Sequence, residues 1–170
     1  MERKNIATMG GNPITLVGDE IKVGEKARDF TVLDNELNPV SLADAKGKNV
    51  IISVVPSIDT SVCASQTRRF NEEAVNFKDT VVYTISVDLP FALGRFCGAE
   101  GIDNVITLSD HRDLDFALKY GFLIKEHRLL ERGIVIIDKT NTVRYVEYVP
   151  EVTNHPDYQK ALAVLEELQD

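Results

Sequence analysis

The sequence predicts an α/β protein whose central sheet is covered by helices on both faces. Three apolar runs have the length of buried strands, at 50–55, 80–87 and 133–138, and a shorter run lies at 105–108. Segments with helical periodicity separate these runs, which is the pattern of sheets covered by helices. An alternating segment at 142–149 follows the last run after a short turn, so an antiparallel hairpin with an exposed or edge strand is expected there.

The composition is that of an ordinary folded protein. The chain has 170 residues, of which 44% are hydrophobic and 27% charged, so we expect one domain spanning 1–170 with a sizeable core. The net charge of -8 argues against binding to nucleic acid or to a membrane surface. No apolar run approaches the roughly 20 residues of a membrane-spanning helix. No signal peptide is visible, and a cytoplasmic location is therefore expected.

The N-terminal part is predicted to consist of short strands. Residues 4–18 carry a hairpin signal, because Gly10-Gly11-Asn12-Pro13 separates two strand-like pieces. Two further pieces, at 30–33 and 40–42, flank the turn residues Asp34-Asn35-Glu36.

Four segments are predicted to be helices: 62–78, 91–100, 113–119 and the residues that follow Pro156. The first is amphipathic, with Val62, Phe70, Ala74 and Phe77 at helical spacings, and these are expected to form its buried face. The second follows Asp88, which we interpret as its N-cap.

The stretch from Pro56 to Cys63 joins the first buried strand to the first long helix. Asp59, Thr60 and Ser61 are all good N-cap residues, so Cys63 falls in or near the first helical turn whichever one caps. The free amides and the positive end of the helix dipole stabilise a thiolate at that position. Cys63 is therefore predicted to be a reactive nucleophile.

Other kinds of site have less support. No metal or cofactor is expected, since the histidines lack metal-ligand spacing and neither a glycine-rich nucleotide loop nor a Cys-x-x-Cys pair is present. No residue supports a Cys–His dyad, although such partners can be distant in sequence. Cys63 and Arg69 match the Cys-x5-Arg pattern of cysteine phosphatases, but the segment lacks glycine and is predicted to be helical. Cys97 alone is interpreted as a small buried hydrophobe.

A wider set of motifs surrounds Cys63. Pro56-x-x-x-Thr60-x-x-Cys63 is the active-site motif of the peroxiredoxins. Further matching segments are Arg69-Phe70-Asn71, Leu89-Pro90-Phe91-Ala92, Arg95 to Gly101, Asn104 to Ser109, Pro156-Asp157-Tyr158 and Gly11-Asn12-Pro13. At constant spacing over essentially the whole chain, they resemble the thiol peroxidase subfamily of the peroxiredoxins, of the atypical two-cysteine type. The resemblance implies a thioredoxin-like fold, with a mixed central sheet flanked by helices and an N-terminal β-hairpin.

The resemblance also implies roles for five residues. Cys63 would attack a hydroperoxide and become a sulfenic acid, and Cys97 would resolve it as an intramolecular disulfide. Thr60 would hydrogen-bond the reacting sulfur and oxygens, and Pro56 would shield the site from water. Arg132 would keep the sulfur ionised. The implied partners are a hydroperoxide substrate, thioredoxin as electron donor and a second copy of the chain in a homodimer.

Some interpretations stay open at this stage. From its spacing alone, Arg132 is better explained by a surface salt bridge, and Arg68, Arg69 and Arg95 are rival cations. Gly133 stands where the resemblance leads us to expect alanine.

The two cysteines also fit a non-enzymatic redox sensor whose disulfide alters a binding surface. If the chain is a peroxidase, residues 61–65 and 91–100 are expected to unfold locally, because a disulfide requires Cα atoms within about 7 Å.

Overall fold

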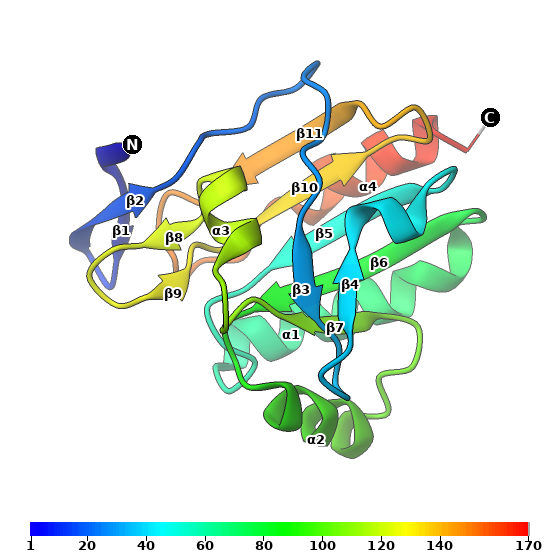
Figure 1. Cartoon of the computed structure of the whole chain (residues 1–170), viewed down its shortest axis with the longest axis horizontal. Coiled ribbons are helices and arrows are strands. Elements are labelled where there is room, and N and C mark those ends of the chain that lie inside the picture. The colour runs from blue at the N-terminus through cyan, green and yellow to red at the C-terminus, as the bar shows by residue number, and fades with distance from the viewer. Residues whose placement is uncertain (170) are drawn as a thin grey trace.

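A seven-stranded mixed sheet forms the centre of the computed structural model, which describes residues 1–169 (Figure 1). Its strands, in spatial order, are β11 (Val143–Tyr148), β10 (Gly133–Ile137), β5 (Asn49–Val54), β6 (Thr80–Ser86), β7 (Ile106–Ser109), β3 (Thr31–Leu33) and β4 (Pro39–Ser41). The pairs β5–β6 and β6–β7 are parallel, and the remaining pairs are antiparallel. The predicted sheet and its hairpin near the C-terminal end, with β11 at the sheet edge, are confirmed.

A smaller antiparallel sheet lies beside the first. Its strands are β1 (Glu2–Met9), β2 (Asn12–Val17), β8 (Leu123–Ile124) and β9 (Leu129–Leu130). The N-terminal hairpin is confirmed, whereas β8 and β9 were not predicted, because two residues are too few to show the alternation of a strand.

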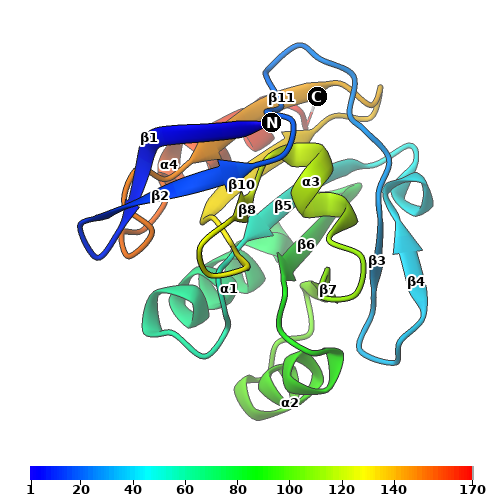
Figure 2. The same cartoon turned by 60° about the vertical axis from the view of Figure 1, so that its left-hand side comes forward.

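Helices cover both faces of the large sheet (Figures 1 and 2). They are α1 (Ser61–Glu73), α2 (Pro90–Glu100), α3 (Asp115–Tyr120) and α4 (Tyr158–Glu167), with 3-10 turns η1 (Leu42–Ala45) and η2 (Ala74–Asn76). On one face, Ile52 packs in a cluster with Phe116 of α3. On the other, Ile51 packs with Phe70 of α1 and Leu165 of α4. Since successive side chains of a strand point to opposite faces, β5 is buried on both.

The first helix differs from its prediction in length and in the face that it buries. It ends at Glu73, and Phe77 lies beyond both α1 and η2. The buried residues of α1 are Cys63, Gln66, Thr67 and Phe70. Of the predicted face, Phe70 is confirmed as buried, Ala74 and Phe77 pack against the same cluster from beyond the helix, and Val62 is only partly buried. Gln66 lies on this buried face and points toward β5, where its amide donates to Ser53 Oγ at 2.8 Å.

The starts of three further helices also differ from those that the sequence predicts. Asp88 does not cap α2; Leu89 takes the N-cap position without a side-chain bond, and Pro90 follows it. The last helix begins at Tyr158 under an Asp157 cap, two residues after Pro156. The short helix α3 begins two residues later than predicted.

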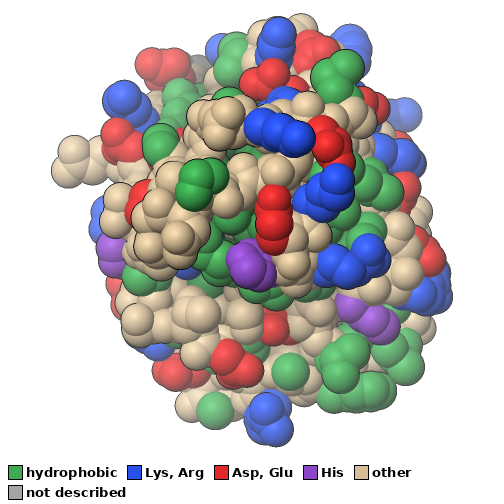
Figure 3. All heavy atoms as spheres, turned by 90° about the vertical axis from the view of Figure 1, so that its left-hand side faces the viewer, with side chains coloured by type: hydrophobic (Ala, Val, Ile, Leu, Met, Phe, Trp, Pro, Cys, Tyr) green, Lys and Arg blue, Asp and Glu red, His purple; other side chains and the backbone are tan. Residues whose placement is uncertain are grey.

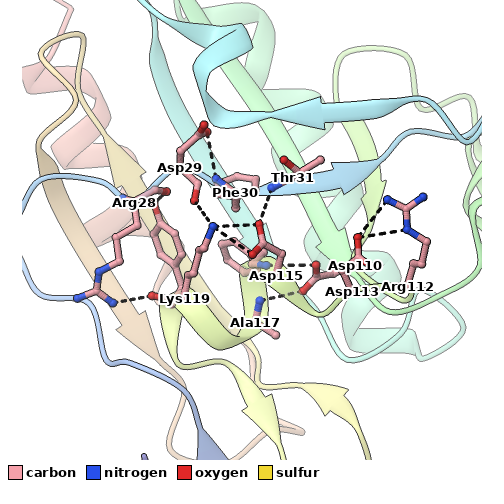
Figure 4. Close-up of polar contacts among 12 residues, drawn as sticks. Arg28, Asp29, Phe30, Thr31, Asp110, Arg112, Asp113, Asp115, Ala117 and Lys119 are labelled. Carbon is pink, nitrogen blue, oxygen red and sulfur yellow. Dashed lines mark hydrogen bonds and ion pairs between the residues drawn. The ribbon is translucent and has the colours of Figure 1, made fainter.

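Carboxylates attach α3 to the large sheet (Figure 4). Asp115 accepts a bond from the Thr31 amide of β3 at 2.8 Å and pairs with Lys119 at 3.1 Å. Asp110, at the end of β7, accepts from the Ala117 amide at 2.8 Å. Burial raises the pKa of Asp110 to about 7, against the opposing effect of the helix amides. Two acidic side chains therefore tie α3 to β3 and to the end of β7.

Acidic and basic side chains are interspersed on the face that carries the N-terminal hairpin (Figure 3). No helix within residues 1–169 is both long enough and apolar enough to span a bilayer.

Candidate active site

The segment between β5 and α1 is held in place by Asp88. Pro56 is buried two residues beyond the end of β5. Beyond it, Ser57 Oγ donates to Asp88 Oδ1 at 2.8 Å and the Ile58 amide donates to Asp88 Oδ2 at 2.9 Å. Asp88 follows β6, the parallel neighbour of β5, so both strands end at the same edge. The carboxylate that the sequence suggested as a cap of α2 instead fixes the loop that leads into α1.

Thr60 is the N-cap of α1. Its Oγ1 accepts a bond from the Cys63 amide at 3.3 Å and lies 3.3 Å from the Ser57 carbonyl. The cysteine therefore lies in the first turn, as expected. Its side chain is fully buried in a small cluster with Val55, Ile58 and Leu93. Leu93 comes from α2, so that helix covers the sulfur.

Arg132 brings a cation to the Cys63 sulfur. The arginine immediately precedes β10, which pairs directly with β5, and its side chain is only 2% exposed. Its Nη2 donates to Cys63 Sγ at 3.2 Å, its Nη1 to Gln66 Oε1 at 3.0 Å and its Nε to the Val152 carbonyl at 2.6 Å. A hydrogen bond from a charged donor stabilises an anionic acceptor more than a neutral one. The surface salt bridge that spacing alone favoured for Arg132 is wrong.

The rival arginines point elsewhere. Arg68 pairs with Glu100 at 3.5 Å, and Arg69 pairs with Glu73 at 3.4 Å, while Arg95 is exposed. The segment from Cys63 to Arg69 is regular helix, so it forms no loop of amides around an anion. The geometry therefore disfavours a cysteine phosphatase.

Glu131 is a buried carboxyl beside the arginine. Its Oε1 accepts from the Arg132 amide at 2.8 Å, while Oε2 has no hydrogen-bond partner among residues 1–169. Burial raises the pKa of Glu131 to about 8, although the neighbouring Arg132 amide and charge act in the opposite direction. At neutral pH this carboxyl is therefore mostly protonated.

Cys97 lies on α2 and is half-buried, with a free thiol like Cys63. Its sulfur is 3.4 Å from Thr107 Oγ1, and that hydroxyl donates to Asn35 Oδ1 at 3.0 Å. The two helices that carry the cysteines are neighbours, since Leu93 of α2 packs in the Cys63 cluster. The two sulfurs have different hydrogen-bond partners, so they occupy separate sites in the reduced protein.

The structure thus brings Cys63, Thr60 and Arg132 together and places Pro56 at the start of the same loop. Three further residues of this region were missed: Gln66, Asp88 and Glu131. Gln66 had a usable signal, because Cys63, Gln66, Thr67 and Phe70 form an i, i+3, i+4, i+7 stripe. Across the part of the chain that the structure describes, no group of three or more His, Cys, Asp or Glu side chains is arranged to hold a metal.

This fold and a buried cysteine at a helix start define a redoxin-type protein. The family model described as Redoxin matches residues 22–162. A solved structure of a peroxiredoxin-like protein from Aquifex aeolicus has a TM-score of 0.90 and 39% identity, covering 98% of this chain and 99% of that one. A thiol peroxidase from Chromobacterium violaceum, at 23% identity and a TM-score of 0.84, supports the same fold over 95% of both chains.

Curated relatives narrow the assignment. The thiol peroxidase of Bacillus subtilis strain 168 is 61% identical over 155 residues, which are 91% of this chain and 93% of that protein. The thiol peroxidase of Listeria monocytogenes serovar 1/2a is 56% identical over 155 residues, 91% of this chain and 94% of that protein. The chain therefore belongs to the thiol peroxidases, a group of peroxiredoxin-type enzymes with a thioredoxin-like fold.

Proposed function

We propose that this chain reduces hydrogen peroxide and organic hydroperoxides to water and alcohols. The oxidised intermediate is a Cys63 sulfenic acid, which Cys97 resolves as an intramolecular disulfide that thioredoxin then reduces. The observation that carries the proposal is the 3.2 Å contact between Arg132 Nη2 and Cys63 Sγ, two side chains that are both buried. Membership of the thiol peroxidases supports the reaction class.

The first step is a displacement at oxygen. The Cys63 thiolate attacks the terminal peroxide oxygen; an S–O bond forms, the O–O bond breaks, and the departing oxyanion takes up a proton as water or alcohol. Donors already aimed at developing charge stabilise such a transition state without reorganising. Arg132, which donates to the Cys63 sulfur, and the first amides of α1 would supply such donors, and Pro56 would help to exclude water.

The second step regenerates a dithiol. Cys97 sulfur attacks the sulfenic sulfur; the S–S bond forms, the S–O bond breaks and water leaves. A dithiol reductant of the thioredoxin type then supplies two electrons and two protons.

Because Leu93 of α2 covers Cys63 while Cys97 is held at Thr107, we propose that 91–100 and the first turn of α1 unfold locally to join the sulfurs.

The deciding experiment compares Cys63→Ser with Cys97→Ser under excess peroxide, with thioredoxin and its reductase as electron source. Cys63→Ser should abolish peroxide consumption. Cys97→Ser should allow one oxidation per protein and then trap a sulfenic acid or proceed to the irreversible sulfinic state. If neither substitution alters peroxide consumption, the assignment is wrong.

A redox sensor with the same thiols is the second candidate. It is separated by turnover, because a sensor consumes about one peroxide per protein and an enzyme consumes many. The resemblance also leads us to propose one domain over residues 1–170 and a homodimer in the cytoplasm, which sedimentation and cell fractionation would test.

A further inference from the structure

A cavity lies at the far end of the two central strands from the reactive sulfur. Along the pairing of β5 with β10, Gly133 lies opposite Val54 at one end and Ile137 lies opposite Val50 at the other. Arg132 and the loop that leads into α1 adjoin the first end. The cavity has a volume of about 250 Å³ and is lined by Val50 and Ile137 at the second end. Four residues of strand separate the two ends, roughly 13 Å, so the cavity is distinct from the candidate active site.

The walls of this cavity are apolar. Five buried side chains line it, and all of them belong to one core cluster: Ala27, Leu42, Ala45, Val50 and Ile137. They come from the segment before β3, from η1 and from the ends of β5 and β10. An apolar protein cavity of about 150 Å³ holds benzene. A cavity of about 250 Å³ therefore has room for an aromatic ring and a short polar arm.

Two lysines at the opening carry unpaired positive charge. Lys46 and Lys48 lie on the turn between η1 and β5, line the cavity and are exposed. Within residues 1–169, neither ammonium group takes part in a salt bridge. A third lysine at the opening, Lys139, is paired with Asp79 at 3.4 Å. The opening thus presents two available cations on a chain whose net charge is -8.

The acidic side chains that line the cavity are occupied by donors of the protein itself. Asp138 forms a salt bridge with Arg144 at 3.1 Å. Asp29 Oδ1 accepts hydrogen bonds from the amides of Phe30 and Ala43 at 3.0 and 3.2 Å, and the first of these bonds is drawn in Figure 4. Since the two carboxylates are engaged and the two lysines are not, the opening favours an anion over a cation.

We propose that this cavity is a binding site for a small aromatic carboxylate. The ring lies against the five buried apolar side chains, and the carboxylate faces Lys46 and Lys48 at the opening. Binding removes apolar surface of both partners from water and supplies the two ammonium groups with a counter-ion. The site uses neither cysteine, so it is a second site beside that of the peroxidase reaction.

The test titrates phenylacetate into the full-length reduced protein and follows the backbone amides by ¹H–¹⁵N NMR. Saturable shifts are expected at residues 42–48 and 137–141. Phenylacetamide has nearly the same shape without the charge, and it should bind at least about fivefold more weakly. Added salt should weaken phenylacetate binding, because the two lysines are exposed to solvent.

A pair of matched variants tests the role of the lysines. The double substitution Lys46→Gln and Lys48→Gln removes two exposed charges at the opening, and phenylacetate affinity should fall about fivefold to tenfold. Lys4→Gln with Lys160→Gln removes the same charge from exposed positions elsewhere and should retain the parent affinity.

Three results would overturn the proposal. The first is the absence of saturable shifts at residues 42–48. The second is a set of shifts confined to residues 56–63, which would place the carboxylate at the candidate active site. The third is equal phenylacetate affinity in the two double variants, which would remove the lysines from recognition.

Discussion

Gly133 lies at the start of β10, directly after Arg132, and has no room for a side chain. A Cβ added there would lie 2.0 Å from the Glu147 carbonyl oxygen on β11 and 2.7 Å from Phe122 Cε1. The first neighbour is backbone and the second is an aromatic ring in the core, so neither can move aside as a flexible side-chain end would. Overpacking of this kind destabilises by about 1–3 kcal/mol, and we expect Gly133→Ala to fall at the upper end, about 3 kcal/mol.

A matched glycine gives the opposite expectation. Gly98 lies in α2 with nothing within 4 Å of an added Cβ. Gly98→Ala should therefore stabilise by up to about 1 kcal/mol, because alanine loses less backbone entropy in a helix. Gly133→Ala should also slow Cys63 oxidation, since separating β10 from β11 displaces Arg132.

Urea unfolding followed by circular dichroism measures both variants against the parent chain. The expected result is two Gly→Ala changes of opposite sign, with the loss at 133 several times larger than the gain at 98. A free energy of unfolding for Gly133→Ala within about 0.5 kcal/mol of the parent would refute the close strand packing on which the estimate depends.

Three further predictions concern single groups. Burial raises the pKa of Glu131 from its ordinary 4.5 to about 8, so the unfolding free energy should fall as pH rises across that window. Glu131→Gln should remove up to about 1.4 kcal/mol per pH unit of this slope in urea titrations, and an unchanged slope would contradict it. Thr107→Val removes the hydroxyl beside Cys97, so disulfide formation should speed up roughly two- to fivefold with less sulfinic acid by mass spectrometry; slower formation would count against a restraining bond. Thr60→Ala should lower stability by about 1 kcal/mol and slow Cys63 oxidation, whereas Thr60→Ser should retain both, and equal losses would exclude the cap.

The long strands and the start of the first helix can be predicted from the sequence, because the patterns that indicate them lie within a few neighbouring residues. Three buried strands and the start of α1 follow from apolar runs, turn residues and N-cap chemistry, and the structure bears them out. The two-residue strands β8 and β9 exist only through pairing with β2 and with each other, and no local pattern can reveal them.

In the candidate active site, too, local features can be predicted from the sequence and tertiary contacts cannot. The place of Cys63 in the first helical turn is a local property, so it was predictable. Arg132 reaches the sulfur only because β10 pairs with β5, and the residue spacing by itself favoured a surface role. The sequence predicts Asp88 as the cap of α2, whereas its carboxylate accepts bonds from Ser57 Oγ and the Ile58 amide in the loop before α1. Those donors lie thirty residues earlier in the chain, so only tertiary packing brings them to Asp88.

The N-terminal hairpin has a bearing on how the protein should be handled. Thr8 exchanges backbone bonds with Pro150 and Val152, and the Val152 carbonyl in turn receives the guanidinium of the reactive centre. Purification tags or truncations at the amino terminus would therefore disturb β1, which holds Val152, the residue whose carbonyl binds Arg132. Kinetic comparisons between preparations are sound only when β1 is left identical in each.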